Sequence, residues 1–317
     1  MNFSFITPIL IAFGVNVFLS PIVIPFLSRL KFGQYIRDDG PSSHLKKAGT
    51  PTMGGIIILT SILITSLFYV RSYPKIIPVL FVTLGFGIIG FLDDFIKVVM
   101  KRSLGLRAWQ KVIGQILVTS IFGYYLLNYT DVDTSMIIPF ANGQVLSLGI
   151  WFLPVLFFVM IGTVNSVNLT DGLDGLAASI TVLVAAFFSV VSIGVNSGIE
   201  PITCAAVGSL LGFLLFNSHP ARVFMGDTGS LALGGFVAAT AYMLQMPLFL
   251  LIVGLIYVLE TTSVMLQVLY FKKTKKRIFK MAPIHHHFEL SGWRETKIVS
   301  VFGIITAILC LIGLLAL

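Results

Sequence analysis

The chain has 317 residues, of which 56% are hydrophobic and only 11% are charged. This composition excludes an ordinary water-soluble domain, in which about a quarter of the residues carry a charge. The formal net charge is +8, and the two cysteines, Cys204 and Cys310, both lie in apolar runs. A disulfide framework and a paired-cysteine metal motif are therefore excluded as well.

Apolar runs long enough to cross a bilayer as helices recur along the chain, with short polar segments between them. We expect residues 1–317 to form one integral membrane domain that is all-α, with about ten transmembrane helices. In chain order the predicted spans cover about 4–27, 54–70, 76–92, 109–128, 149–166, 176–195, 202–217, 229–246, 248–270 and 298–317. The first run lacks the features of a cleaved signal peptide, so we expect it to remain as a span.

The basic residues predict the orientation of these spans. All of the 21 Lys and Arg residues except Arg71 and Lys75 fall on one side of the predicted membrane. Basic residues in short loops are retained in the cytoplasm, so we expect both termini to face outward. Most acidic residues share the cytoplasmic side, which predicts an active site at that face.

The third predicted span ends in "FLDDFIKV", residues 91–98, which sets Asp93 beside Asp94. Asp93 and Lys97 are four residues apart and share one face of a helix. One alternative is an interfacial helix end with a weak surface ion pair. The other is that the two carboxylates handle a metal or a proton on a membrane-embedded substrate, which is favoured because carboxylates near hydrocarbon are costly.

Two short loops concentrate polar residues before apolar helices. In "NSVNLTDGLDG", residues 165–175, the glycines permit close approach of a ligand, while Asn and Asp side chains offer contacts. An Asx turn that caps the next helix is the alternative there. In "NSHPARVFMGDTGS", residues 217–230, either Asp227 or Thr228 is an ordinary N-cap, or free amides, Ser230 and a Mg²⁺ on Asp227 hold phosphate. Phe224 is placed to stack on a base.

The last large loop contains the basic run 272–277 and three consecutive histidines, His285, His286 and His287. We interpret the basic run as positive-inside anchoring and attraction to anionic lipids. Consecutive histidines point in different directions, so they are a poor cage for one metal. They are suitable donors to phosphate or sugar oxygens.

The stretch "GFGIIG", residues 85–90, matches a dinucleotide-binding pattern but lies inside a predicted span. Its glycines, like Gly208 and Gly212, predict close helix packing instead. Neither a Walker A sequence nor a G-x-S-x-G elbow is present, so ATP hydrolysis and serine hydrolase chemistry are not indicated.

Five motifs together resemble a known family. They are "GTPTMGG" (49–55), "FLDDFIKV" (91–98), "NLTDGLDGLA" (168–177), "FMGDTGS" (224–230) and "PIHHHFEL" (283–290). They are similar to the signature loops of the polyprenyl-phosphate N-acetylhexosamine-1-phosphate transferases. The histidines followed by Phe-Glu resemble the members that use a muramoyl-pentapeptide donor. The resemblance covers nearly the whole chain.

The resemblance implies a dimeric, multi-pass enzyme of the bacterial cytoplasmic (inner) membrane that functions in peptidoglycan synthesis. It implies transfer of phospho-MurNAc-pentapeptide from UDP-MurNAc-pentapeptide to undecaprenyl phosphate, which yields lipid I and UMP and requires Mg²⁺. Nucleic acid is not an expected partner. Asp227 is implied as the main Mg²⁺ ligand, and Asp93 and Asp94 are implied to act on the lipid phosphate or its proton. His285 completes the catalytic candidates.

The remaining candidate residues are predicted to bind substrate. Lys97 and Lys111 are expected to neutralise the repulsion between the two phosphate groups. The full set is Lys47, Thr52, Lys97, Lys111, Asn168, Asp171, Gly172, Asp174, Asn217, Phe224, Ser230, Gln267, His286 and His287. Among them, Lys47, Asp174 and Phe224 are implied to line a uridine pocket.

The sequence leaves two mechanisms and two alternative functions open. A single displacement by the lipid phosphate is favoured over a phosphorylated carboxylate, because a phosphate oxyanion is already a nucleophile. A UDP-GlcNAc transferase is the alternative within the enzyme class. A transporter is the alternative outside it, but only Glu260 lies deep within an apolar run, whereas transporters bind substrates near the midplane.

Overall fold

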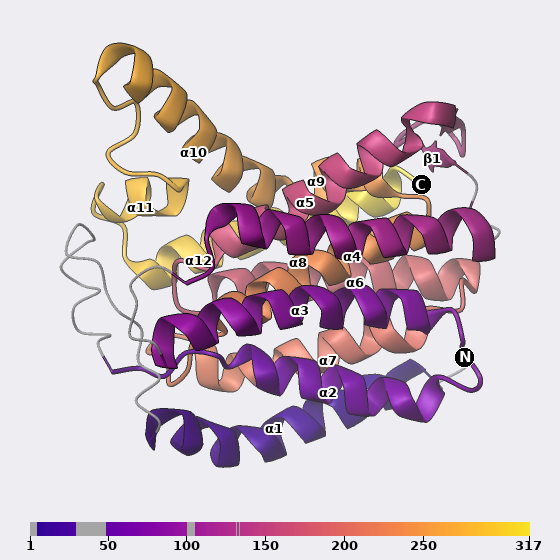
Figure 1. The fold of residues 1–317 in the computed structure, drawn as a ribbon, viewed down its shortest axis with the longest axis horizontal. Helices are drawn as coiled ribbons and strands as arrows, with labels where there is room; N and C mark the ends of the chain where they lie inside the picture. Colours follow the sequence, from indigo (N-terminus) through magenta and orange to yellow (C-terminus); the bar gives the residue numbers. More distant parts are fainter. Residues whose placement is uncertain (1–4, 30–48, 100–104, 131, 133) are drawn as a thin grey trace.

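The computed structural model describes residues 5–29, 49–99, 105–130, 132 and 134–317. Most of the long helices lie side by side along one direction and form a bundle (Figure 1). In chain order the long helices are α1 (Ile6–Arg29), α2 (Gly55–Tyr69), α3 (Ile76–Val99), α4 (Ala108–Tyr129), α5 (Phe152–Thr170), α6 (Leu176–Val195), α7 (Glu200–Asn217), α8 (Gly226–Met243), α10 (Leu255–Thr274) and α12 (Glu295–Leu315). Shorter helices are η3 (Gly149–Trp151), η4 (Pro247–Phe249), α9 (Leu250–Val253) and α11 (Ile284–Glu289).

Each of the ten predicted apolar segments contains a helix, which confirms a helical, polytopic membrane protein. Within the described residues, seven helices are long and apolar enough to cross a membrane, and a bent pair of helices makes an eighth candidate. Helix α2 has only 15 residues, and α8 is not among the candidates. The number of ten crossings stays a prediction.

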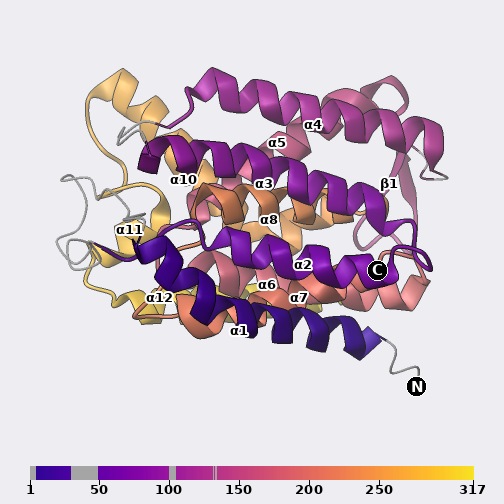
Figure 2. The ribbon, with the colours of Figure 1, turned by 60° about the horizontal axis from the view of Figure 1, so that its bottom comes forward.

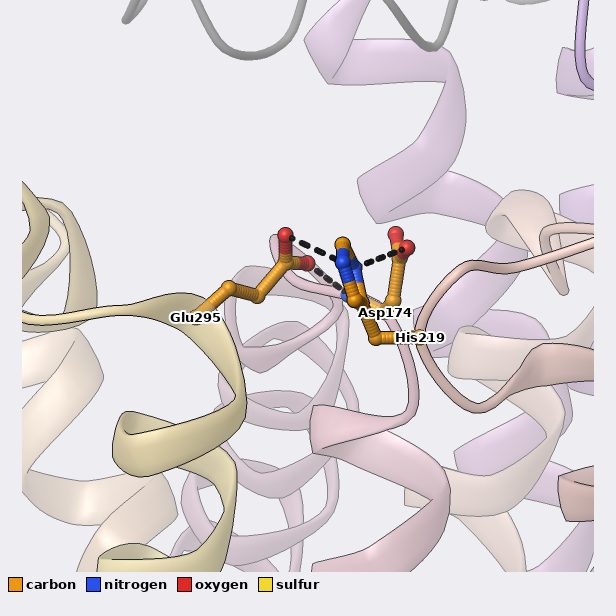
Figure 3. Close-up of side chains that lie close together, drawn as sticks. All are labelled: Asp174, His219 and Glu295. Atoms are coloured by element: carbon orange, nitrogen blue, oxygen red, sulfur yellow. Dashed lines mark hydrogen bonds and ion pairs between the residues drawn. The ribbon is translucent and has the colours of Figure 1, made fainter.

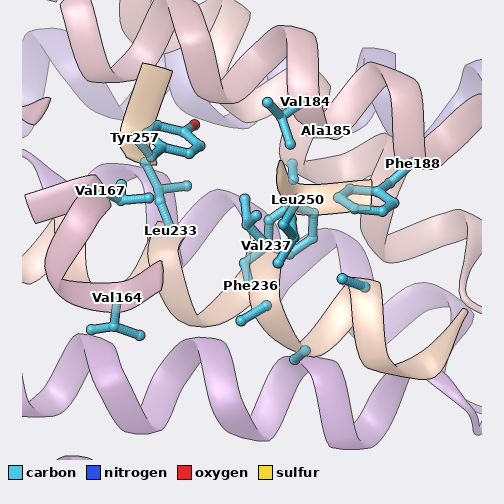
Figure 4. Packing of buried hydrophobic residues seen from close by; sticks show 14 of the residues in the cluster. Val164, Val167, Val184, Ala185, Phe188, Leu233, Phe236, Val237, Leu250 and Tyr257 are labelled. Atoms are coloured by element: carbon cyan, nitrogen blue, oxygen red, sulfur yellow. The ribbon is translucent and has the colours of Figure 1, made fainter. Parts of the chain in front are cut away.

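Helix α8 lies inside the bundle and packs against α3, α5 and α2. Side chains of α8, α5 and α6, among them Phe236, Val164 and Val184, belong to one buried hydrophobic core (Figure 4). Small residues allow this close contact: a Cβ atom on Gly234 would lie 2.5 Å from the Cα of Val164. Because protein surrounds α8 on most sides, it can be less apolar than a helix that faces lipid.

The predicted close packing at glycines is confirmed. A Cβ atom on Gly90 of α3 would overlap the carbonyl oxygen of Asp227, and one on Gly208 of α7 would overlap that of Ile9. A methyl group cannot fit against backbone at such positions, so α3 approaches α8 and α7 approaches α1 only because these residues are glycine.

The span predicted over about 248–270 corresponds to a bent pair of helices, which is a candidate crossing if the pair forms one span. The chain breaks at Gly254, and the segments Pro247–Val253 and Leu255–Thr274 meet at 83°. Proline and glycine weaken a continuous helix at this place. As a result α10 leaves the bundle at an angle (Figure 1).

A small β-hairpin in the predicted connection between α4 and α5 is a feature that helical periodicity did not indicate. Strand β1 (Ser135–Ile137) pairs with β2 (Val145–Ser147) in antiparallel register, with Met136 opposite Leu146. The hairpin, the start of α1 and the C-terminus lie at one end of the bundle, and α11 lies at the other (Figures 1 and 2). The described polar motifs therefore gather at the end opposite the termini.

Candidate active site

The centre of the site is a cluster of two lysines and two aspartates from three helices. Lys97 Nζ lies 2.5 Å from Asp93 Oδ2, which confirms the predicted shared face, and 3.2 Å from Asp227 Oδ2. Lys111 Nζ lies 3.1 Å from Asp93 Oδ2 and 2.6 Å from Asp227 Oδ2. Asp93 is fully buried, and its other oxygen accepts a hydrogen bond from the backbone of Leu106 at 2.7 Å.

Asp94 makes its hydrogen bonds to the start of α8. Its carboxylate accepts hydrogen bonds from the backbone and hydroxyl of Thr228 at 2.9 and 2.7 Å, and from the backbone of Asp227 at 3.2 Å. The suggested N-cap by Asp227 or Thr228 is wrong, because α8 already begins at Gly226. The two adjacent carboxylates thus face different partners.

Asn168 and Ser230 complete the surroundings of Asp227. The Asn168 side-chain amide donates to Asp227 Oδ1 at 3.1 Å and to Ser230 Oγ at 2.8 Å, and Ser230 donates to the carbonyl of Gly226. Thr52 lies close by, since a Cβ atom on Gly226 would be 2.8 Å from its hydroxyl. The structure therefore brings these predicted residues together.

The donor set fits a magnesium ion. Asp93, Asp94 and Asp227 each offer a carboxylate oxygen, and the three oxygens lie within 4.8 Å of one another. Carboxylate oxygens are the ligands that Mg²⁺ prefers in proteins. The two lysine ammonium groups between Asp93 and Asp227 show that this position favours positive charge.

Two aspartates outside the candidate spans respond to this cluster in opposite ways. Burial raises the pKa of Asp227, but the charges of Lys97 and Lys111 outweigh it and hold that pKa below its usual range. Burial, followed by the negative charges of neighbouring aspartates, raises the pKa of Asp171 well above its usual range. These shifts favour the charged form of Asp227, which suits a metal ligand, and disfavour ionisation of Asp171.

A second group joins Asp174 to His219 and Glu295 (Figure 3). His219 Nδ1 lies 3.0 Å from Asp174 Oδ2 and 3.4 Å from Glu295 Oε2, and the backbone of Asp174 donates to Glu295 at 2.5 Å. These residues tie together the loop after α5, the loop after α7 and the start of α12. Neither His219 nor Glu295 was a predicted site residue, because the only signal in the sequence is a titratable side chain in a predicted cytoplasmic loop.

A third group contains the first histidine. His285 Nδ1 lies 3.0 Å from Glu260 Oε2, and both side chains are buried. A Cβ atom on Gly172 would overlap His285 Nε2, so this glycine lets the imidazole contact the loop after α5. Glu260 was noted only as a lone acid within an apolar run, and the structure shows its partner.

The other two histidines point elsewhere, as predicted. His286 Nδ1 lies 2.7 Å from Glu289 Oε2, and His287 Nδ1 accepts a hydrogen bond from the backbone of Lys280 at 3.1 Å. The three imidazoles therefore do not converge on one ion.

The remaining candidates brace loops in this structure. Gln267 accepts hydrogen bonds from the backbone of Ile278 and Phe279 and donates to the carbonyl of Phe279. Asn217 donates to the carbonyl of Val223, and the backbone of Phe224 pairs with the segment 51–54. Lys47 lies outside the described residues. Contact of these residues with substrate stays a prediction.

Comparison with known proteins is consistent with this arrangement. Residues 76–245 match the model of Glycosyl transferase family 4, and residues 47–59 match the Phospho-N-acetylmuramoyl-pentapeptide-transferase signature 1. Both matched segments contribute to the site: Thr52 lies in the signature, and the three clustered aspartates lie in the family region.

Three relatives named phospho-N-acetylmuramoyl-pentapeptide-transferase illustrate the similarity. The chain is 54% identical to the protein of Acetivibrio thermocellus over 97% of this chain and 94% of that protein. It is 52% identical to that of Clostridium kluyveri, over 99% and 100%, and 51% identical to that of Caldicellulosiruptor bescii, over 99% and 98%. With these identities over nearly the full length, the chain belongs to the phospho-N-acetylmuramoyl-pentapeptide-transferase family of multi-pass membrane enzymes.

Proposed function

We propose that this protein transfers phospho-MurNAc-pentapeptide from UDP-MurNAc-pentapeptide to undecaprenyl phosphate and forms lipid I and UMP in a Mg²⁺-dependent reaction. The observation that carries the proposal is the cluster of Asp93, Asp227, Lys97 and Lys111 at one end of the apolar bundle. The substrates follow from the relatives and from the histidine motif.

The charges of the cluster suit a reaction between two anions. A lipid phosphate and a nucleotide pyrophosphate repel each other, and Lys97 and Lys111 supply positive charge where they meet. A Mg²⁺ ion held by Asp227 would neutralise further charge on the phosphoryl oxygens. Asn168 donates to the same carboxylate and holds its orientation.

The position of the cluster suits a substrate that is partly in lipid. Phe91, Leu92 and Phe95 expose apolar side chains on α3 directly beside the buried carboxylates. At such a boundary the polyprenyl tail of the acceptor can stay in hydrocarbon while its phosphate meets a water-soluble donor. This supports an enzyme acting at the membrane surface.

We favour a single displacement. An oxygen of the lipid phosphate attacks the β-phosphorus of the donor, and the bond to the bridging oxygen breaks so that UMP leaves with the electron pair. One of the paired carboxylates assists the acceptor. Attack by Asp93 itself has less support, because its Oδ2 is held by two lysines and its Oδ1 by the backbone of Leu106.

The decisive experiment measures UMP release by the purified protein in detergent, with UDP-MurNAc-pentapeptide, undecaprenyl phosphate and increasing Mg²⁺. We expect release only when donor, acceptor and metal are all present. A carrier releases no UMP under these conditions, and preference for UDP-GlcNAc as donor would identify the alternative transferase.

The pairing of Glu260 with His285 gives that acid a role other than transport.

We also propose that the protein is a homodimer in the bacterial cytoplasmic (inner) membrane, with its site facing the cytoplasm. The distribution of basic residues supports this orientation. Single cysteines introduced at the exposed positions Lys276 and Asn142 test it with a membrane-impermeant thiol reagent in intact cells. Labelling is expected at Asn142 only, and labelling at Lys276 alone would reverse the orientation.

A further inference from the structure

The start of α8 has no local cap. The residue before it, Met225, makes no side-chain hydrogen bond to the first turn. Backbone N–H groups in the first turn of a helix have no acceptor within the helix and need one from elsewhere. Here the acceptor is the carboxylate of Asp94, which comes from α3 and takes the N–H groups of Asp227 and Thr228.

Both carboxylate oxygens of Asp94 take part in this contact. Oδ2 accepts both the N–H and the hydroxyl of Thr228, and Oδ1 accepts the N–H of Asp227. Its side chain is only 4% exposed. A carboxylate at a helix N-terminus is stabilised by charge-assisted hydrogen bonds and by the helix dipole, so giving up these donors is costly.

Two glycines make room for this contact. Gly90 lies one turn before Asp94 on α3, where a Cβ atom would overlap the carbonyl oxygen of Asp227. Gly226 has a φ of +68°, and a Cβ atom there would lie 2.5 Å from Asp94 Oδ2. The backbone of α8 therefore contacts α3 directly at Asp227.

We infer that Asp94 is a positioning residue that caps α8 and thereby sets the Asp227 carboxylate against Lys97, Lys111 and a divalent metal. Asp93, whose Oδ2 faces both lysines, is then the carboxylate that meets the acceptor phosphate. The inference deepens the proposed function and rests on it for the identity of the reaction. The capping of α8 by Asp94 does not depend on the proposed reaction, because its hydrogen bonds alone support it.

The test measures Mn²⁺ binding to the purified protein by electron paramagnetic resonance, without substrates, beside UMP release. Asp94→Asn is expected to raise the Mn²⁺ dissociation constant by about 10- to 100-fold, as loss of a group that orients a metal ligand does. Thr228→Val removes one donor to Asp94 and is expected to change the constant in the same direction, by about threefold to tenfold. Thr228→Ser keeps the hydroxyl and is expected to bind Mn²⁺ about as tightly as the wild type does.

Thr240→Val is the matched control, because Thr240 lies on the same helix and its hydroxyl has no hydrogen-bond partner among the described residues. The inference would be overturned by Mn²⁺ binding that is unchanged in Asp94→Asn while UMP release is lost, or by Thr228→Val binding Mn²⁺ as tightly as Thr240→Val does. Wild-type protein that binds no Mn²⁺ would overturn it as well. If Asp94→Asn fails to fold, the two Thr228 variants carry the test.

Failure of the proposed function gives a different pattern. Wild-type protein would then bind Mn²⁺ with the predicted dependence on Asp94 and Thr228, yet release no UMP from the muramoyl donor.

Discussion

The two ends of the site are held in different ways. The start of α8 is fixed by backbone contacts, with glycines of α2 and α3 seated against it and the Asp94 carboxylate on its first turn. The arm formed by α10 and α11 leaves the bundle, and the side-chain pair of Glu260 with His285 joins its two helices (Figure 1). The clustered charges of Asp93, Asp227, Lys97 and Lys111 lie at the first end, which we call the rigid end because backbone contacts hold it.

The largest effect is expected from Asp227→Asn at the rigid end. The carboxylate meets both lysines and Asn168, so its loss removes the proposed main metal ligand and unbalances the cluster. We expect UMP release to fall on the order of 10²- to 10³-fold, with a changed dependence on Mg²⁺. Unchanged activity and metal dependence would remove Asp227 from the site.

Gly90→Ala tests whether backbone contact fixes this end. The added methyl group overlaps the carbonyl of Asp227, so α3 and α8 must separate. We expect a loss of roughly 1–3 kcal/mol in the free energy of unfolding and at least about tenfold lower UMP release. Gly303→Ala on α12 is the control, because a Cβ atom there meets nothing within 4 Å. Equal behaviour of the two variants would contradict the comparison.

Glu260→Gln probes the arm. The change keeps the shape but replaces the carboxylate that faces His285 Nδ1 with an amide, so we expect about tenfold lower UMP release. Combination with His285→Ala is expected to add little to the effect of His285→Ala alone, since the two residues act as a pair. Additive losses would show that Glu260 acts independently of the histidine.

Asp171→Asn concerns the loop between the two regions and has the smallest expected effect. Burial raises the pKa of Asp171 in the folded state. The folded protein therefore holds a proton that the unfolded chain loses above its pKa of about 4. As pH rises above this value, the wild-type protein loses stability. At pH 8 the midpoint temperature of thermal unfolding should be a few degrees higher for the variant than for the wild type. This difference in midpoint temperature should shrink toward pH 4. A difference that is independent of pH would contradict this assignment.

Local pattern predicted much of this molecule. Apolar runs indicated the helices, the spacing of Asp93 and Lys97 predicted a shared face, and glycines within spans predicted close packing. The motifs also indicated which loops supply the site, and the described loops do gather at one end. These features depend on the spacing of residues a few positions apart or on contact with lipid. Both can be predicted from the order and polarity of the residues.

Pairings between distant segments were decided only by the tertiary structure. Nothing in "FLDDFIKV" indicates that Asp94 caps a helix that begins at Gly226, or that Asp93 alone faces the lysines. The 83° break before α10 and the partnership of Glu260 with His285 were likewise beyond local pattern. The physical reason is that helical periodicity determines which side chains share a face, whereas the packing of whole helices determines what that face meets.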